Sequence, residues 1–226
     1  EIGFEPDVAL TDLEAVDHIY LLSPPTAEYA DPRRSPAKLR WLDRTGVTLG
    51  AFSGGIFATF IDWRMLPILT DAVQAGGWVW RGVAAWDKTE GARPVIGGMR
   101  AQCEFIVWAS AGSRGGTDDI REGYPDAPAL PGCFRYVVKQ ADKHHQTGKP
   151  TPLMRDLVQL APPDGLIVDP LAGSFTTGVA AVPMGRRVVG CEISEEYSRI
   201  ALDRMADVTF TPRAATAAQP SLGGIL

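Results

Sequence analysis

The sequence predicts an α/β fold in which a mostly parallel sheet is covered by helices on both faces. Short apolar runs alternate with helix-like segments along most of the 226-residue chain. Hydrophobic residues make up 45% of the chain, which is enough for one sizeable core. In addition, the apolar run at residues 165–168 leads through a small-residue turn into a second apolar pattern, as in a strand–turn–helix unit.

The individual elements follow from the apolar pattern in chain order. Residues 17–22 form an apolar run stopped by Ser23-Pro24-Pro25, which predicts a buried strand that ends in a rigid turn. A second strand is expected at residues 57–61, followed by a helix at 63–75 that ends at Gly76-Gly77. We expect further strands at 78–86, 103–109, 165–168 and 187–190, and further helices at 151–160, 176–184 and 194–205, the last capped by Ser194.

The remaining stretches are expected to be loops within a single domain. Residues 31–50 are rich in charge without a sustained apolar period, which indicates a loop or a mobile helix. Residues 110–140 are dominated by Gly, Pro, Asp and Arg, which is typical of a long surface excursion that carries recognition. We therefore predict one domain at residues 1–208, with a recognition loop at about 110–140, and a flexible tail at 209–226.

Composition excludes several classes of protein. The net charge of -5 and the pI near 5.2 disfavour a protein that coats nucleic acid through bulk charge, although a local basic face stays open. Three cysteines without a CxxC pair indicate a reducing compartment and neither a disulfide framework nor a zinc site. The paired His144-His145 lacks a carboxylate or cysteine at ligand spacing, so no metal is expected. Without a membrane span or a signal pattern, we expect a cytoplasmic protein that does not contact membranes.

The first candidate site is the turn Asp169-Pro-Leu-Ala-Gly173-Ser-Phe-Thr-Thr177, together with Glu192 at the end of the following strand. An acidic residue about twenty positions after such a turn is placed to accept hydrogen bonds from ribose hydroxyls. A purely structural strand-to-helix connection explains the turn equally well.

The second candidate site is Ser23-Pro24-Pro25-Thr26, which follows the first predicted strand. Consecutive prolines fix the backbone, so the Ser23 hydroxyl and the Pro24 carbonyl form a rigid pair of hydrogen-bond acceptors that suits an amino group. A proline-stiffened loop entry is the alternative. The third segment, residues 144–153, is interpreted as a basic loop that precedes a helix.

In content and order, these three segments resemble the S-adenosylmethionine-dependent DNA amino-methyltransferases in their permuted arrangement, where the catalytic motif precedes the cofactor motif. Residues 23–26 are similar to the family's (D/S)PP(Y/W), residues 145–150 to H-P-x-x-K-P, and residues 169–177 to D-P-F-x-G-S-G-T-T. The resemblance runs from about residue 17 to residue 205, and it includes features of small bacterial and phage members, namely Asp62-Trp63-Arg64, Trp86-Asp87-Lys88 and Glu104-Phe105.

The resemblance implies a Rossmann-like methyltransferase fold, with a mostly parallel seven-stranded sheet and an antiparallel strand near one edge. It implies S-adenosylmethionine as the cofactor and double-stranded DNA as the partner. The implied reaction is site-specific methylation of the exocyclic amino group of a flipped cytosine (N4) or adenine (N6), with Ser23 favouring cytosine. Restriction-modification is the implied setting, and a second copy of the chain is a further candidate partner.

The resemblance also assigns residues to roles. Acceptors at Ser23 and Pro24 draw the amino hydrogens out of plane and localise the lone pair on the nitrogen. The implied catalytic residues are Ser23, Pro24, Pro25 and Thr26. Because they follow this motif closely, Tyr29, Arg33 and Arg34 are the candidate substrate-binding residues. The implied cofactor-binding residues are Asp169, Pro170, Ala172, Gly173, Ser174, Phe175, Thr176, Thr177, Glu192, Lys149 and Pro150.

Two positions depart from the family pattern. Thr26 stands where an aromatic residue normally stacks on the flipped base, and Phe175 replaces a glycine that lets the cofactor approach the backbone. The Phe175 ring either rotates away or fills the site. If the two departures are lesions, Phe175→Gly and Thr26→Tyr raise activity. They keep open an alternative, a protein with impaired catalysis that acts as a DNA-binding or assembly subunit. We expect Trp78, Trp80 and Trp108 in the core and Cys191 in a buried strand.

Overall fold

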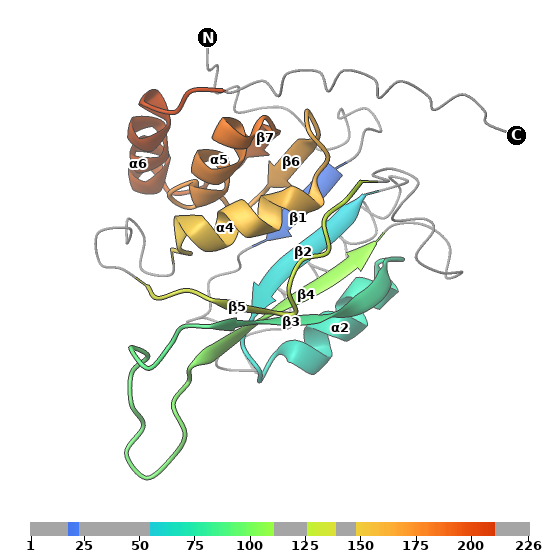
Figure 1. The fold of residues 1–226 in the computed structure, drawn as a ribbon, viewed down its shortest axis with the longest axis vertical. Helices are drawn as coiled ribbons and strands as arrows, with labels where there is room; N and C mark the ends of the chain where they lie inside the picture. Colours follow the sequence, from blue (N-terminus) through green and yellow to red (C-terminus); the bar gives the residue numbers. More distant parts are fainter. Residues whose placement is uncertain (1–17, 23–54, 111–125, 139–147, 211–226) are drawn as a thin grey trace, which may run out of the picture.

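The computed structural model describes residues 18–22, 55–110, 126–138 and 148–210 (Figure 1). Within these ranges, a seven-stranded sheet has the order β5-β3-β4-β2-β1-β6-β7. Strand β4 is antiparallel to both of its neighbours, and the other strand pairs are parallel. The strands are β1 (His18–Leu22), β2 (Ile56–Ile61), β3 (Val79–Asp87), β4 (Cys103–Ser110), β5 (Cys133–Arg135), β6 (Leu166–Asp169) and β7 (Arg187–Gly190).

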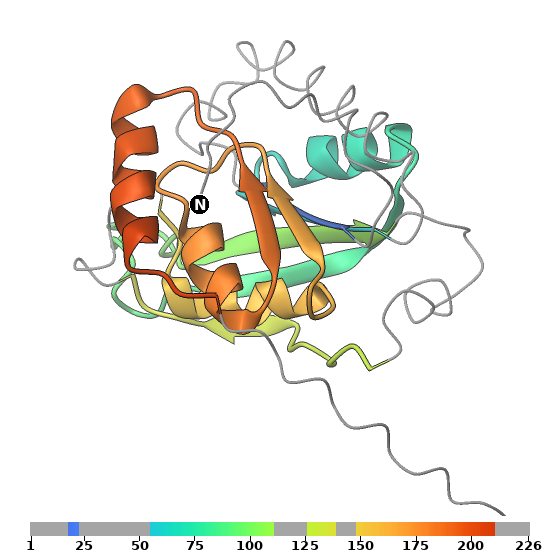
Figure 2. The ribbon, with the colours of Figure 1, turned by 90° about the horizontal axis from the view of Figure 1, so that it is seen from above.

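Helices cover the sheet on both faces (Figures 1 and 2). They are α2 (Leu66–Ala75), α4 (Thr151–Leu157), α5 (Thr176–Ala181) and α6 (Glu195–Ala206), with 3-10 turns η4 (Val158–Leu160) and η5 (Val182–Met184). Helix α2 lies on one face, whereas α4 and α5 lie on the other and α6 packs against α5. Within the described residues, no helix combines the length and the apolar character needed to span a bilayer.

Alternation along β2 explains why two separate cores form. Every residue of this central strand is buried, and successive side chains point to opposite faces. Ala58 and Phe60 pack in the cluster that includes Leu153 of α4, whereas Phe57 packs in the cluster that includes Leu69 of α2. A strand that is buried on both faces reads as a continuous apolar run, which is why the sequence predicts it well.

Most of the predicted elements are confirmed to within a few residues. The helices expected at 151–160 and 176–184 are α4 and α5, each of which tightens into a 3-10 turn at its end. Ser194 caps α6 as predicted, because its hydroxyl accepts a hydrogen bond from the Tyr197 backbone N–H at 3.4 Å. Within the stretch 110–140, for which the sequence predicts no strand, residues 133–135 form β5, which pairs in parallel with β3. This strand has three residues, of which only Phe134 is buried, so it leaves no periodic signal.

Two burial predictions are also wrong. Cys191 is exposed, because the chain leaves β7 at Gly190 and the cysteine follows the strand. Trp80 is 42% exposed, and its indole N–H donates to the Gly82 carbonyl beside a register shift in β3. Trp78 is buried against Phe57, as expected.

The strand directions place several chain segments at one edge of the sheet. Strands β1, β2, β3, β6 and β7 run in the same direction, since β2 and β3 are both antiparallel to β4. Their last residues therefore lie along one edge, which we call the carboxyl edge: Leu22, Ile61, Asp87, Asp169 and Gly190. Ligands of open parallel sheets bind beyond this edge.

Candidate active site

The turn between β6 and α5 is tied to the end of β7. The Cys191 backbone N–H donates to the Asp169 carbonyl at 3.0 Å, and the Ala172 N–H donates to the Cys191 carbonyl at 2.9 Å. Gly173 has a φ of 55°, a left-handed conformation that favours glycine. The Gly173 N–H donates to Glu192 Oε2 at 2.8 Å, and the Ser194 N–H donates to Glu192 Oε1 at 2.8 Å. The predicted ribose-binding carboxylate is thus fixed against the predicted cofactor turn.

Asp169 is a buried carboxylate at the base of this turn. Its oxygens accept hydrogen bonds from the Thr177 hydroxyl and from the Leu171 backbone N–H. Burial raises the pKa of Asp169 to about 6, with Glu192 adding to the rise, although the two hydrogen bonds oppose it. Among the described residues, no Lys or Arg forms an ion pair with Asp169. A cationic ligand would supply the missing positive charge.

Lys149, just before α4, lines the same pocket as Asp169 and is buried. Its Nζ donates to Glu104 Oε2 at 3.1 Å and lies 4.9 Å from the centroid of the Phe60 ring. Glu104 is also paired with Lys88 at 3.3 Å. Burial alone would raise the pKa of Glu104, but the ion pairs with Lys149 and Lys88 outweigh it and hold the pKa below its usual value. The sequence singles out Glu104 only as part of a resemblance and assigns it no role.

A pocket at the carboxyl edge brings most of the predicted cofactor residues together. It is lined by Gly148, Lys149, Met154, Asp169, Leu171, Ala172, Gly173, Ser174, Thr176 and Thr177. Of the other predicted cofactor residues, Glu192 lies next to the turn through its bond to Gly173, whereas Pro150 is buried at the N-cap position just before α4. Pro170 and Phe175 do not line the pocket.

Phe175 turns its ring away from the pocket, which decides between the two expected orientations. The ring packs with Ala201 and Met205 of α6 in a separate apolar cluster. One ring edge faces Gly178 of α5 and the opposite edge faces Gly190 of β7. The backbone of Phe175 keeps a left-handed φ of 56°, the conformation that glycine adopts most easily. The turn therefore keeps the backbone shape that glycine provides, although the side chain is large.

The turn is also held by Arg204 of α6, which the sequence analysis does not identify. Its guanidinium donates to the Ser174 carbonyl, to Ser174 Oγ at 3.1 Å and to Thr176 Oγ1 at 3.0 Å. No motif marks this arginine, because it lies on a polar helix 28 residues after Thr176 and contacts the turn only in the folded chain.

The predicted catalytic and substrate-binding residues fall outside the described residues: Ser23, Pro24, Pro25, Thr26, Tyr29, Arg33 and Arg34. The strand that leads to them is described. Strand β1 pairs in parallel with β6, with Tyr20 opposite Val168, and it ends at Leu22. The chain thus leaves β1 toward Ser23 about one strand spacing, roughly 5 Å, from the β6 backbone near Asp169.

Comparison with known proteins places the chain in a family. The N6_N4 methyltransferase model, described as a DNA methylase, matches residues 51–203. YhdJ of Escherichia coli (strain K12), a DNA adenine methyltransferase, is 33% identical over 111 residues, which cover 45% of this chain and 37% of YhdJ. The chain spans less than two thirds of the length of the curated relatives that it matches.

Solved structures of DNA methyltransferases share the fold. The PvuII DNA methyltransferase, which is cytosine-N4-specific, matches with a TM-score of 0.68 at 17% identity, over 87% of this chain and 82% of that chain. The complex of M1.HpyAVI with S-adenosylmethionine matches with a TM-score of 0.65 at 21% identity, over 84% of this chain and 89% of that chain. The Rossmann-like methyltransferase fold expected from the sequence is therefore confirmed. Because the family model matches more than half of the residues of this chain, the chain belongs to the N6/N4 DNA methylase family.

Proposed function

We propose that this chain transfers a methyl group from S-adenosylmethionine to the exocyclic amino group of a flipped cytosine or adenine in double-stranded DNA. The observation that carries the proposal is the position of the pocket. A turn with a buried carboxylate and a fixed Glu192 lies one strand away from the point where the chain leaves β1 toward Ser23. This arrangement supports a donor site next to the strand that leads to the proposed acceptor residues.

The described residues fit S-adenosylmethionine. This cofactor supplies an activated methyl group on a sulfonium centre and also carries an ammonium group. Asp169 has no cationic partner among the described residues, and a positive ligand beside it would offset the cost of keeping its carboxylate ionised. Glu192 would accept hydrogen bonds from the ribose, since Gly173 and Ser194 already hold both carboxylate oxygens in place.

The chemistry of the acceptor side rests on Ser23 and Pro24. Their oxygens would accept the two hydrogens of the target amino group, which localises the nitrogen lone pair for attack on the methyl carbon. Tyr29, Arg33 and Arg34 would contact the DNA near the flipped base. Ser23 favours cytosine over adenine as the target, and the relatives include enzymes named for each base.

One of the two observations that favoured the alternative, a protein with impaired catalysis, no longer supports it. It rests on Phe175 and Thr26, but the Phe175 ring points away from the pocket and leaves the turn open. Thr26 lies outside the described residues. The Thr26→Tyr substitution remains the test of that departure.

A methyl-transfer assay tests the proposed function. The chain is incubated with unmodified DNA and labelled S-adenosylmethionine, the DNA is digested, and the nucleosides are identified by mass spectrometry. We expect N4-methylcytosine, or N6-methyladenine if the target is adenine. Ser23→Ala should lower the transfer rate about 100-fold while leaving cofactor binding unchanged, because it removes one preorganised partner of the amino group.

Thr209→Ala is the matched control, since this hydroxyl is exposed and lies outside the pocket at the carboxyl edge. It should transfer methyl groups at the wild-type rate. Cofactor binding without any methylated nucleoside would instead support the non-catalytic subunit.

A further inference from the structure

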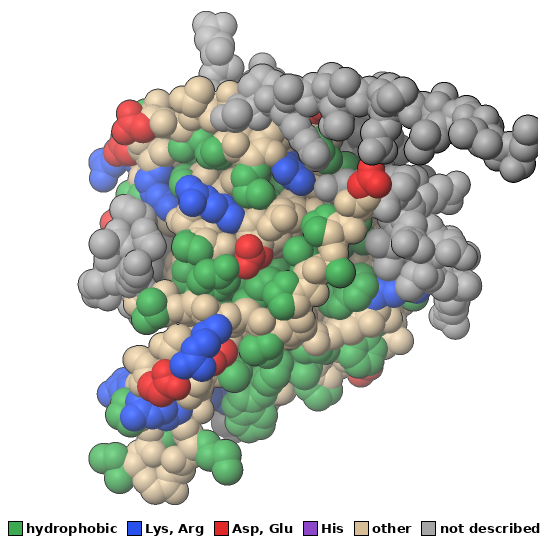
Figure 3. Space-filling view, in the orientation of Figure 1, with side chains coloured by type: hydrophobic (Ala, Val, Ile, Leu, Met, Phe, Trp, Pro, Cys, Tyr) green, Lys and Arg blue, Asp and Glu red, His purple; other side chains and the backbone are tan. Residues whose placement is uncertain are grey.

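The connection between β3 and β4, residues 88–102, forms an arm that projects from the carboxyl edge (Figures 1 and 3). It leaves β3 at Asp87 and returns at Cys103, and the Lys88 N–H closes its base by donating to the Gln102 carbonyl at 2.9 Å. Since β3 and β1 end at the same edge, the arm extends on the side of the sheet where the candidate site lies.

Hydrogen bonds brace the stem of this arm. Arg135 of β5 pairs with Asp87 at 3.0 Å and with both Glu90 oxygens at 2.8 Å. Arg100 donates to the backbone carbonyls of Glu90 and Ala92, each at 2.8 Å. The side chain of Gln102 adds a bond to Asp87 at 2.7 Å. These bonds join the two sides of the arm and anchor it to the sheet, so the stem is formed before any partner binds.

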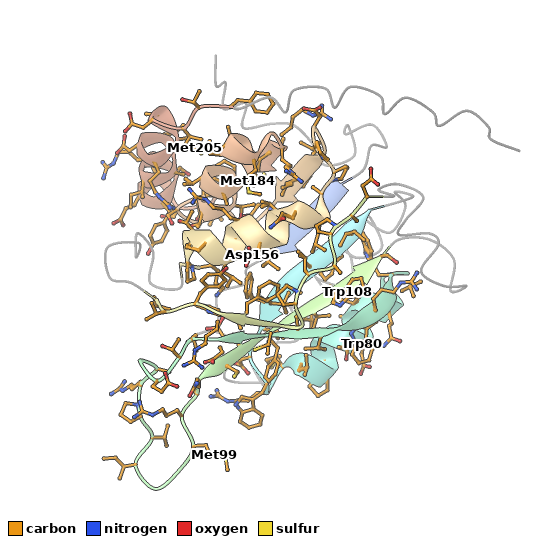
Figure 4. All side chains as sticks on the ribbon, in the orientation of Figure 1. Trp80, Met99, Trp108, Asp156, Met184 and Met205 are labelled. Carbon is orange, nitrogen blue, oxygen red and sulfur yellow. The ribbon has the colours of Figure 1, made fainter. Side chains whose placement is uncertain are left out.

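The tip of the arm is apolar and open to solvent. Ile96 is 101% exposed, Met99 94% and Val95 52%, and Met99 stands at the far end of the molecule (Figures 3 and 4). The turn between them is formed by Gly97, which has a φ of 75°. Large side chains with this exposure add nothing to the core of the folded chain, and such tips commonly mark a binding surface.

The charge of the arm suits a nucleic acid. Residues 88–102 carry three cations (Lys88, Arg93 and Arg100) and one anion (Glu90), a net charge of +2 in a chain whose net charge is -5. Arg93 is exposed next to the apolar tip. Cations beside an apolar wedge are the combination found where proteins insert side chains between base pairs, because the cations bind phosphates while the wedge enters the stack.

The distance along the carboxyl edge between the arm and β1 also suits contact with one duplex. Strand β4 lies two strands from β1 in the sheet order. At about 4.8 Å between neighbouring strands, the side of the arm that joins β4 lies roughly 10 Å from the point where the chain leaves β1 toward Ser23. This separation is close to the length of three base-pair steps of about 3.4 Å each. An arm at this position reaches a duplex within a few base pairs of a base held at Ser23.

We propose that the tip of the β3–β4 arm enters the DNA beside the target base, where Ile96 and Met99 fill the space that the flipped base leaves in the stack. The inference rests on the proposed function, because it assumes that a base is flipped. Extrusion of a base costs stacking and pairing, and an apolar side chain in the gap offsets part of that cost. The arm should therefore matter for a paired target and not for an unpaired one.

Transfer rates on two substrates test this inference. One duplex carries the target base in a normal pair, and the other carries the same base opposite an abasic site. We expect Ile96→Ser combined with Met99→Ser to lower the rate at least tenfold on the paired duplex and less than twofold on the unpaired one. Leu202→Ser, an exposed leucine on α6, is the matched control and should leave both rates unchanged. Equal losses on both substrates, or no loss on either, would overturn the proposal.

Photocrosslinking identifies the partner of the tip independently of catalysis. With p-benzoylphenylalanine in place of Ile96, irradiation of the full chain with duplex DNA should yield a protein–DNA crosslink. A crosslink only to a second copy of the chain, or no crosslink, would exclude DNA as the partner. If wild-type chain transfers no methyl group to either duplex, the proposed function fails, and a DNA crosslink would still show that the tip contacts DNA.

Discussion

Gly190→Ala is expected to lower the free energy of unfolding by about 3 kcal/mol, the upper end of what overpacking a core costs. An added Cβ at Gly178 would lie 2.5 Å from Phe175 Cε1, and one at Gly190 would lie even closer to Cε2 on the opposite ring edge. The ring cannot move away from one glycine without approaching the other. The two glycines thus make the space that a phenylalanine at position 175 requires.

Chemical denaturation of the variants measures this effect. Gly132→Ala is the control, because a Cβ there meets nothing within 4 Å, and it should change stability by no more than about 0.5 kcal/mol. The double variant Gly190→Ala with Phe175→Leu should lose at least about 1 kcal/mol less than the sum of the single variants, since the shorter side chain relieves the overlap. If the losses of the two single variants were strictly additive, the Phe175 ring would not be confined between the two glycines.

Asp169→Asn is expected to raise the free energy of unfolding by about 3 kcal/mol at pH 7.5. The pKa of Asp169 is about 6 in the folded chain against an ordinary 3.8, so the folded state binds the proton more tightly than the unfolded state. The contribution of Asp169 to stability is therefore most favourable below about pH 4 and is lost as the pH rises through about 6, where the buried carboxylate ionises. Asparagine is neutral and removes this cost, and the Thr177 hydroxyl can accept from its amide.

The gain in stability should depend on pH. Denaturation at pH 7.5 and at pH 4 should show the full gain for Asp169→Asn at the higher pH and almost none at the lower. Asp203→Asn, an exposed position on α6, should show no such gain. A variant that is equally stable or less stable than wild type at pH 7.5 would mean that Asp169 is not a strained buried anion.

The pattern of apolar residues predicted β2 and β6 because these two strands are almost entirely buried. Both strands read as apolar runs bounded by turn residues, whereas β5 has one buried residue and was missed. The motif spacing anticipated that Glu192 lies beside Gly173, because adjacent parallel strands bring their ends together. The residues that meet at neighbouring strand ends can thus be predicted from the order of the strands and the spacing of the motifs.

Contacts made by single side chains across helices could not be predicted in this way. Arg204 reaches Ser174 from α6, and nothing in its surroundings along the chain distinguishes it from other helix arginines. The orientation of Phe175 depends on the absence of a Cβ at two distant glycines. The sequence suggested that this residue is a lesion, but in the fold it is part of the core, so the structure gives no reason for glycine at 175 to raise activity.

The most direct test of the account is a calorimetric titration of the full chain with S-adenosylmethionine at pH 7.5. We expect saturable binding at one site per chain, and at least about tenfold weaker binding by Asp169→Asn, because a hydrogen bond to a charged group is lost. No saturable heat at millimolar cofactor would contradict the account, and so would an Asp169→Asn variant that binds as tightly as wild type.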